Sequence, residues 1–311
     1  MADRTLAGVA FMLGFAATGP LIDAFSKLAA DTLPVGQVTA ARFVVQGALM
    51  LPVAALGGGL LLPRALWGPV ALRGLLLAAS TFAFVSAVDV MPLADAMAVF
   101  FVMPFILMLL ARLVHGDPVG PRRVAAAFVG FAGALLVIRP SVAAFGWAAL
   151  WPLATAVAFA GYMLVTRGLS GRLAAVPMQL HTAAAAAAPC LLALWAAEGT
   201  GAAAWDPLWP EGRAWAWLLG TGVASAVAHL LVTAALARAP AATLAPLNYL
   251  EIVGAAALGA LVFGDVPEPA TGAGIALIVG SGLYVIHRER AASAARRAAP
   301  PRRGRAPGAA G

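Results

Sequence analysis

The chain has 311 residues, of which 62% are hydrophobic and only 11% are charged, against about 25% charged residues in an average soluble domain. This composition excludes a water-soluble globular fold, because no interior of that size can hide so much apolar surface. The net charge of +7 does not indicate a nucleic-acid partner, because many of the basic residues are arginines of the C-terminal tail and most others fall in short loops. The lipid bilayer is therefore the expected surroundings.

Apolar stretches follow one another along the chain, and many approach the length of about 20 residues that a membrane-spanning helix needs. We predict an all-α membrane protein with ten transmembrane helices at residues 6–28, 35–56, 73–91, 93–113, 122–139, 145–166, 174–197, 214–236, 241–263 and 268–287. The first stretch is too long for the core of a signal peptide, so it is interpreted as a membrane helix.

Lysine and arginine are concentrated in every second connection, and cytoplasmic loops carry the excess of these residues. With both termini in the cytoplasm, the outer connections hold only Lys27, Arg139 and Arg213. The inner connections then hold Arg4, Arg64, Arg73, Arg112, Arg122, Arg123, Arg167, Arg172 and Arg238. The pattern predicts this orientation in an inner membrane.

Ionisable residues at bilayer depth cost about 2.5–3.5 kcal/mol on insertion scales, so each is expected to face a cavity or a partner. Asp23 and Lys27 are four residues apart in the first span and share one face of the helix. They are interpreted either as a structural ion pair or as a gating or substrate contact. Arg42 in the second span needs an acidic partner, which we expect to be Asp23 or Glu251.

The chain aligns with itself at a displacement of 148 residues, which places residues 91–138 on 239–286 without a gap. The informative matches are Pro92 with Pro240, Gly116 and Asp117 with Gly264 and Asp265, and Pro121 with Pro269. This maps spans four and five onto nine and ten, an odd displacement, so the copies cross the membrane in opposite senses. We predict two inverted five-helix repeats, at 6–139 and 145–287, that rock about a central site. Residues 288–311 are predicted to be a disordered basic cytoplasmic tail.

The ninth span carries a polar stripe formed by Asn248 and Glu251 in otherwise apolar surroundings. Through the repeat these positions correspond to Phe100 and Met103. We expect both faces to flank one cavity, with Phe100 and Met103 against the flat part of a solute and Asn248 and Glu251 along its polar edge. The alternative is a structural stripe that ties helices together by hydrogen bonds.

Other residues are weaker candidates for the transport pathway. Tyr162 lies deep in its span and is a possible solute contact, whereas Arg73 is expected at the membrane interface. His229 has no metal-ligand spacing to another histidine, so a hydrogen-bonded helix contact is expected. Phe101 and Tyr249, which the repeat aligns, are expected to pack between helices.

Several short stretches resemble the drug/metabolite transporter superfamily, specifically its EamA type, over about residues 6–287. They are DAFSK at 23–27, ARF at 41–43, LRG at 72–74, FVMP at 101–104, APLNYLE at 245–251 and FGD at 263–265. The resemblance implies two five-helix repeats around a central cavity, and it is greatest to the branch of bacterial riboflavin and S-adenosylmethionine transporters. It implies a bacterial inner-membrane secondary transporter of a small organic metabolite. Riboflavin uptake is the leading expectation, with S-adenosylmethionine or amino-acid and metabolite transport, inward or outward, as alternatives.

An enzyme is not expected, because the chain lacks a Gly-x-Ser-x-Gly elbow, an His-Glu-x-x-His helix and a phosphate-binding glycine loop. A channel is disfavoured because the spans carry too few polar residues for a continuous lining. No cofactor or metal is expected, and the expected partners are a small-molecule substrate and lipid, with a homodimer left open. Transport would follow an ion gradient or the solute's own gradient, and protonation of Glu251 or Asp23 is the natural coupling step.

Overall fold

The computed structural model describes residues 2–57, 59–91, 93–117, 119–138, 146–258 and 269–298, which are helical and contain no β-sheet. The first half comprises α1 (Ala2–Ala30), α2 (Val35–Leu56), α3 (Trp67–Val90), α4 (Leu93–Phe100), α5 (Met103–His115) and α6 (Pro121–Ile138). The second half comprises α7 (Leu150–Leu169), α8 (Ala175–Ala197), α9 (Ala214–Leu236), α10 (Ala241–Leu244), η4 (Ala245–Tyr249), α11 (Leu250–Leu258) and α12 (Pro269–Ala298). Short 3₁₀ turns, η1 (Arg64–Leu66) and η3 (Gly146–Ala149), precede α3 and α7.

In the part of the chain that the structure describes, each of the ten predicted spans coincides with one of these helices or with consecutive pieces of one. Within the described residues, six helices are long and apolar enough to cross a membrane, and further apolar helices are shorter. Two spans are broken: the fourth into α4 and α5, and the ninth into α10, η4 and α11. Pro104 and Pro246 are the second residues of α5 and η4, where proline is tolerated because its missing N–H would have no partner within the helix.

The prediction of a disordered tail is wrong at its start, because α12 continues to Ala298. Residues 288–298 are therefore helical. Alanine and arginine are strong helix formers, and the membrane-spanning part of α12 supplies the nucleus from which they extend the helix. Residues 299–311 lie outside the described residues, as do Arg139 and the second Gly-Asp pair at 264–265.

Short connections make consecutive long helices antiparallel and define two faces of the bundle. We call N-face the side on which α1, α3 and α8 begin and α2, α7 and α9 end. The opposite face is where α1, α3 and α8 end and α7 and α9 begin. A residue's position along its helix therefore shows which face it is nearer.

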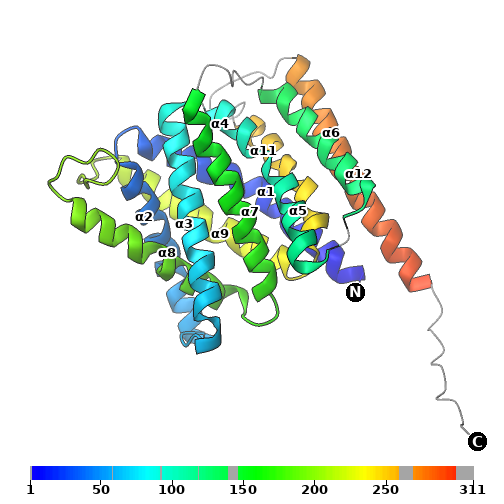
Figure 1. The fold of residues 1–311 in the computed structure, drawn as a ribbon, viewed down its shortest axis with the longest axis horizontal. Coiled ribbons are helices and arrows are strands. Elements are labelled where there is room, and N and C mark those ends of the chain that lie inside the picture. Colours follow the sequence, from blue (N-terminus) through cyan, green and yellow to red (C-terminus); the bar gives the residue numbers. More distant parts are fainter. Residues whose placement is uncertain are drawn as a thin grey trace, which may run out of the picture.

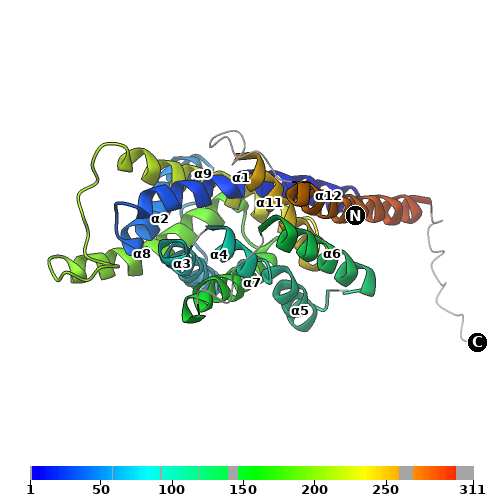
Figure 2. The ribbon, with the colours of Figure 1, turned by 90° about the horizontal axis from the view of Figure 1, so that it is seen from above.

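The helix packing has a counterpart in each half when the helices of the two halves are matched in order. The contact of α1 with α9 corresponds to that of α7 with α3, and the contact of α2 with α9 corresponds to that of α8 with α3. The remaining large contacts join matched helices, α2 with α8 and α6 with α12, which lie at opposite edges of the bundle (Figures 1 and 2). This is the packing expected of two equivalent halves.

The matched residues Phe101 and Tyr249 meet where the two broken spans come together. Their rings are tilted at 5.6 Å between centroids, and the Tyr249 hydroxyl donates a hydrogen bond of 3.0 Å to the Phe101 carbonyl. Gly130 of α6 faces the Tyr249 ring so closely that a Cβ would lie 2.6 Å from it. The expectation that these two aromatic residues pack between helices is confirmed.

Candidate functional site

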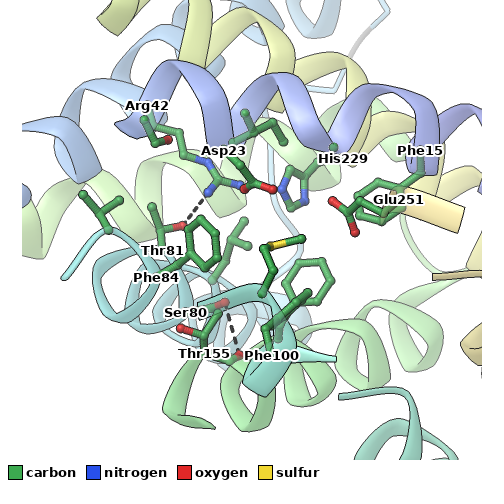
Figure 3. Close-up of a pocket in the computed structure, with 17 residues that line it drawn as sticks. Phe15, Asp23, Arg42, Ser80, Thr81, Phe84, Phe100, Thr155, His229 and Glu251 are labelled. Atoms are coloured by element: carbon green, nitrogen blue, oxygen red, sulfur yellow. Dashed lines mark hydrogen bonds between the residues drawn. The ribbon is translucent and has the colours of Figure 1, made fainter. Parts of the chain in front are cut away.

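A pocket lies among α1, α2, α3, α4, α7, α9 and α11, so both halves contribute to it (Figure 3). The cavity volume is about 60 Å³, and the space among its side chains with open solvent included is about 560 Å³. Its lining is Phe15, Gly19, Ile22, Asp23, Ser26, Arg42, Leu77, Ser80, Thr81, Phe84, Val85, Met97, Phe100, Thr155, Phe159, His229 and Glu251. Five of these residues, from Phe15 to Ser26, follow one face of α1, because they recur at three- and four-residue spacing.

A guanidinium group and a carboxylate face each other across one wall of the pocket. Arg42 of α2 is buried and donates hydrogen bonds to Thr81 Oγ1 at 2.7 Å and to His229 Nε2 at 2.5 Å. Asp23 of α1 points toward Arg42 and interacts with it electrostatically (Figure 3). The expected acidic partner of Arg42 is therefore Asp23, supplemented by two neutral acceptors that the sequence did not predict.

A second carboxylate, that of Glu251, enters the pocket from α11. It reaches α1 at Gly19, where a Cβ would lie 2.0 Å from Glu251 Oε1. Its carboxylate has no hydrogen bond or ion pair to any residue in the described part of the chain, and it lies within electrostatic range of Asp23. Two acids and one guanidinium therefore share the pocket, and one of the acids, Glu251, has no hydrogen-bond partner among the described residues.

Aromatic rings form the remaining wall of the pocket. Phe100 of α4 contacts Phe84 at 6.3 Å and Phe159 at 6.0 Å between ring centroids. Phe159 in turn stacks on Phe15 at 6.3 Å with an interplanar angle of 17°. The pocket thus combines flat apolar surfaces with a charged edge, an arrangement that suits a planar solute carrying polar groups.

His229 connects the pocket to a second polar region deeper in the bundle. Because arginine can only donate, His229 Nε2 must accept the hydrogen bond from Arg42, which places the ring proton on Nδ1. His229 Nδ1 lies 2.7 Å from the hydroxyl oxygen of Tyr162, which therefore accepts from it. Tyr162 also accepts a hydrogen bond of 2.7 Å from Arg73. A continuous chain of contacts joins Arg42 to Arg73.

The structure brings together four of the eight predicted site residues: Asp23, Arg42, Phe100 and Glu251 line the pocket. Tyr162 lies beside the pocket, stacked on Phe159 at 5.4 Å. Lys27, Met103 and Asn248 do not line the pocket. The alternative of an Asp23–Lys27 ion pair is not observed, because the Asp23 carboxylate turns toward Arg42 instead.

The expected polar edge of Asn248 beside Glu251 is wrong. Asn248 is buried, and its amide nitrogen donates to the Ala245 carbonyl at 3.0 Å. The prediction assumed a continuous α-helix, whereas Asn248 lies in the 3₁₀ segment η4 and Glu251 in α11. Met103 is buried in α5, after the break that separates α5 from α4, and does not line the pocket either.

The sequence led to a wrong position for Arg73 and to an incomplete role for His229. Arg73 was expected at the membrane interface but is completely buried, and His229 was expected only to join helices. A signal for His229 does exist in the sequence, because Thr221, Ser225, His229 and Thr233 recur every four residues and form one polar stripe along α9. Among the described residues, no three His, Cys, Asp or Glu side chains are placed to hold a metal ion.

Comparison with known proteins gives a family match over nearly the whole predicted membrane region. The EamA-like transporter family matches this chain twice, at residues 6–139 and at 146–286. A riboflavin transporter of Rhizobium johnstonii is 32% identical over 219 residues, which cover 70% of this chain and 69% of that protein. An S-adenosylmethionine uptake transporter of Rickettsia prowazekii is 23% identical, over 92% of this chain and 94% of the relative.

A solved crystal structure has the same fold as this chain. The two superpose with a TM-score of 0.72 at 23% sequence identity, covering 93% of this chain and 98% of the other. At that identity the likeness concerns the helical fold alone. The pocket's chemistry has to be interpreted from this chain's own residues.

Proposed function

This chain belongs to the EamA-like transporter family and is a membrane transporter of small metabolites, and from that premise we propose that it carries riboflavin into the cell. The similarity to the riboflavin transporter of Rhizobium johnstonii supports this substrate. The observation that carries the proposal is the pocket itself, with rings of Phe15, Phe100 and Phe159 facing a charged edge. Riboflavin has a flat ring system and a polyhydroxylated side chain, and both parts find complementary surfaces.

The charged edge supplies the polar contacts in this proposal. Arg42 donates toward carbonyl oxygens of the ring system, and the carboxylates of Asp23 and Glu251 accept from hydroxyl groups. Glu251 suits this role because its carboxylate has no protein partner among the described residues. A buried polar group without a hydrogen-bond partner costs free energy. A bound solute that donates a hydrogen bond to Glu251 removes this cost, and this strengthens its binding.

The two family-matched ranges, 6–139 and 146–286, are proposed to be oppositely oriented halves that rock about the pocket. The distribution of lysine and arginine supports an inner-membrane location in a bacterial cell with both termini in the cytoplasm. The N-face is then the cytoplasmic side. In this proposal the chain remains embedded in the bilayer, and transport requires no cofactor.

Growth of a riboflavin-auxotrophic bacterium at limiting vitamin tests the proposed substrate. The intact chain should restore growth, and Glu251→Ala should not, although it should reach the membrane in equal amount. Glu211→Ala, which removes an exposed carboxylate from the α8–α9 connection, is the matched control and should restore growth fully. Absence of rescue by the intact chain would reject riboflavin as the substrate.

A second candidate substrate is S-adenosylmethionine, and one observation favours it. The pocket contains two acidic side chains and one guanidinium, and the excess of acidic groups suits a cationic solute. The named relative in Rickettsia prowazekii supports the same solute. Uptake of radiolabelled S-adenosylmethionine into cells that express the chain, compared with riboflavin uptake in the same cells, separates the two.

A further inference from the structure

A cluster of polar side chains lies directly beneath the pocket and takes no part in lining it. Its centre is Arg73 of α3, which is completely buried. Around it stand Tyr162, Thr166, Gln179, Thr182 and Thr233, and we call these six residues the Arg73 cluster. Leu77, one helical turn from Arg73, belongs to the pocket lining, so the cluster and the pocket are adjacent layers.

All five N–H groups of Arg73 are used within the bundle. Its Nε donates to Thr166 Oγ1 at 2.7 Å, and its Nη1 donates to Thr182 Oγ1 and to the Met178 carbonyl at 3.4 Å. Its Nη2 donates to Tyr162 Oη at 2.7 Å and to Thr233 Oγ1 at 3.1 Å. One guanidinium group of α3 therefore ties together α7, α8 and α9.

The cluster also bridges the two halves of the chain through glutamines. Gln179 of α8 donates to Thr233 Oγ1 at 2.7 Å and to the His229 carbonyl at 2.6 Å. Gln46 of α2 donates to Gln179 Oε1 at 3.0 Å. Helices α2 and α3 of the first half are thus joined to α7, α8 and α9 of the second half in one layer.

This layer lies on the N-face side of the pocket. Arg73 lies near the start of α3 and Gln179 and Thr182 near the start of α8, while Thr166 and Thr233 lie near the ends of their helices. The pocket residues Ser80, Thr81 and Phe84 of α3 all follow Arg73 toward the opposite face. A solute in the pocket that moves toward the N-face therefore meets the Arg73 cluster first.

The chemistry of the cluster suits a barrier that opens. All acceptors of Arg73 are hydroxyl or carbonyl oxygens, and no carboxylate pairs with it among the described residues. Water can replace each of these neutral acceptors when helices separate, so the guanidinium remains hydrogen-bonded in both states. An apolar seal would instead expose apolar surface to water on opening.

The cluster is also connected to the solute site. Tyr162 accepts hydrogen bonds from both Arg73 and His229, and His229 accepts from Arg42 in the pocket wall. A solute that contacts Arg42 or His229 competes for the same hydrogen bonds. The contacts that hold the cluster together are therefore sensitive to occupation of the pocket.

From these observations we infer that the Arg73 cluster is the closed gate between the pocket and the N-face, and that the Tyr162–His229–Arg42 contacts link its opening to a solute in the pocket. The gate rests on the chain being a transporter, but on no particular solute. Part of this gate is the contact between α3 and α8 at Gly74. The two helices are so close there that a Cβ on Gly74 would lie 2.7 Å from Ala185 Cβ. The gate opens when these helices and α9 move apart.

Accessibility of a pocket cysteine from each side of the membrane tests the gate. The chain has a single cysteine, Cys190, so Cys190→Ala gives a background without thiols. Ser80→Cys then places one thiol in the pocket. Its reaction with a membrane-impermeant maleimide is measured in vesicles of known orientation, with the reagent on the N-face side and no solute present.

In the parent protein the pocket thiol should react slowly from the N-face. Thr233→Val removes an acceptor shared by Arg73 and Gln179 and should raise that rate about tenfold, which corresponds to about 1.4 kcal/mol. Thr221→Val is the matched control, because Thr221 is equally buried on α9 but bonds only to its own helix at Trp217. It should leave the rate unchanged.

Fast labelling of the parent protein from the N-face would overturn the gate, because the pocket would then already be open to that side. An unchanged rate in well-folded Thr233→Val would also overturn it and leave the cluster a purely structural element. If Thr233→Val fails to fold, Thr182→Val removes a different Arg73 acceptor and is judged by the same rate. These outcomes need no riboflavin, so failure of the gate and failure of the proposed substrate are separate results.

Discussion

The pocket and the Arg73 cluster are both polar and buried in a lipid-embedded bundle, but they differ in where their partners come from. Every N–H of Arg73 meets an acceptor of the protein. In the pocket, by contrast, Glu251 has no hydrogen bond within the described chain. Polar groups that have hydrogen-bond partners in the protein hold helices together, whereas a polar group without such a partner is available to bind a solute. Substitutions in the two regions should therefore affect different properties.

The largest effect is expected from Arg73→Met, which should damage stability before transport. It leaves several buried acceptors without a donor, each at a cost of about 1–3 kcal/mol, so the loss should reach about 3 kcal/mol or more. Thermal unfolding of the purified protein in detergent should show a markedly lower midpoint. Arg64→Met, at an exposed arginine of η1, is the control and should unfold like the parent. Equal midpoints for both variants would remove the distinction between the two regions.

Gly19→Ala should abolish most transport, because the new Cβ would lie 2.0 Å from Glu251 Oε1 and force this carboxylate out of its place. Uptake of labelled solute should fall by about tenfold or more, which is the effect of losing about 1.4 kcal/mol of binding. Gly280→Ala adds the same methyl group to α12 in open space and should transport normally. Normal uptake by Gly19→Ala would show that the position of Glu251 is unimportant.

Glu251→Gln should leave stability unchanged, because Glu251 has no hydrogen bond to the described residues, but should reduce uptake. A hydrogen bond to a charged group contributes about 1.5–3 kcal/mol, so we expect roughly a tenfold to hundredfold loss. If Glu251 carries the coupled proton, the remaining uptake should no longer respond to an imposed pH gradient. Normal uptake by this variant, together with parent uptake that ignores the gradient, would reject the coupling role of Glu251.

Lys27→Gln should have the smallest effect, although Lys27 is a charged residue of the first span beside the pocket acid Asp23. Lys27 does not line the pocket, so uptake should stay within about twofold of the parent, as for substitutions away from functional features. Asp23→Asn in the same helix should reduce uptake clearly. A loss in Lys27→Gln as large as in Asp23→Asn would restore the predicted role of that pair.

Much of the fold could be predicted from the sequence, because the length of apolar stretches and the positions of Gly, Pro and Arg depend on local chemistry. The ten spans are examples. The breaks in the fourth and ninth spans were not predicted, although Pro104 and Pro246 lie at them. A proline can be accommodated in a continuous membrane helix, as Pro52 is in α2, and neighbouring helices decide which outcome occurs.

The site could be predicted only in part. The free-energy cost of burying a charge in the membrane identifies candidate residues, but it does not identify the residues that they contact. Asp23, Arg42 and Glu251 were found by that cost. Arg73 was missed because it lies close to the start of its predicted span, where arginine commonly faces the interface. Its burial depends on Thr166, Thr182 and Thr233 from three other helices, and no local pattern shows that these residues meet.

Binding of riboflavin to the purified protein tests the central assignment of the pocket most directly. Binding immobilises the fluorescent isoalloxazine ring, so a titration followed by fluorescence polarisation reports its insertion among Phe15, Phe100 and Phe159. We predict a saturable rise in polarisation in the parent, much weaker binding in Phe100→Ala and Glu251→Gln, and unchanged binding in Thr221→Val. Equal binding by the parent and both pocket variants would contradict the assignment and place the solute elsewhere in the bundle.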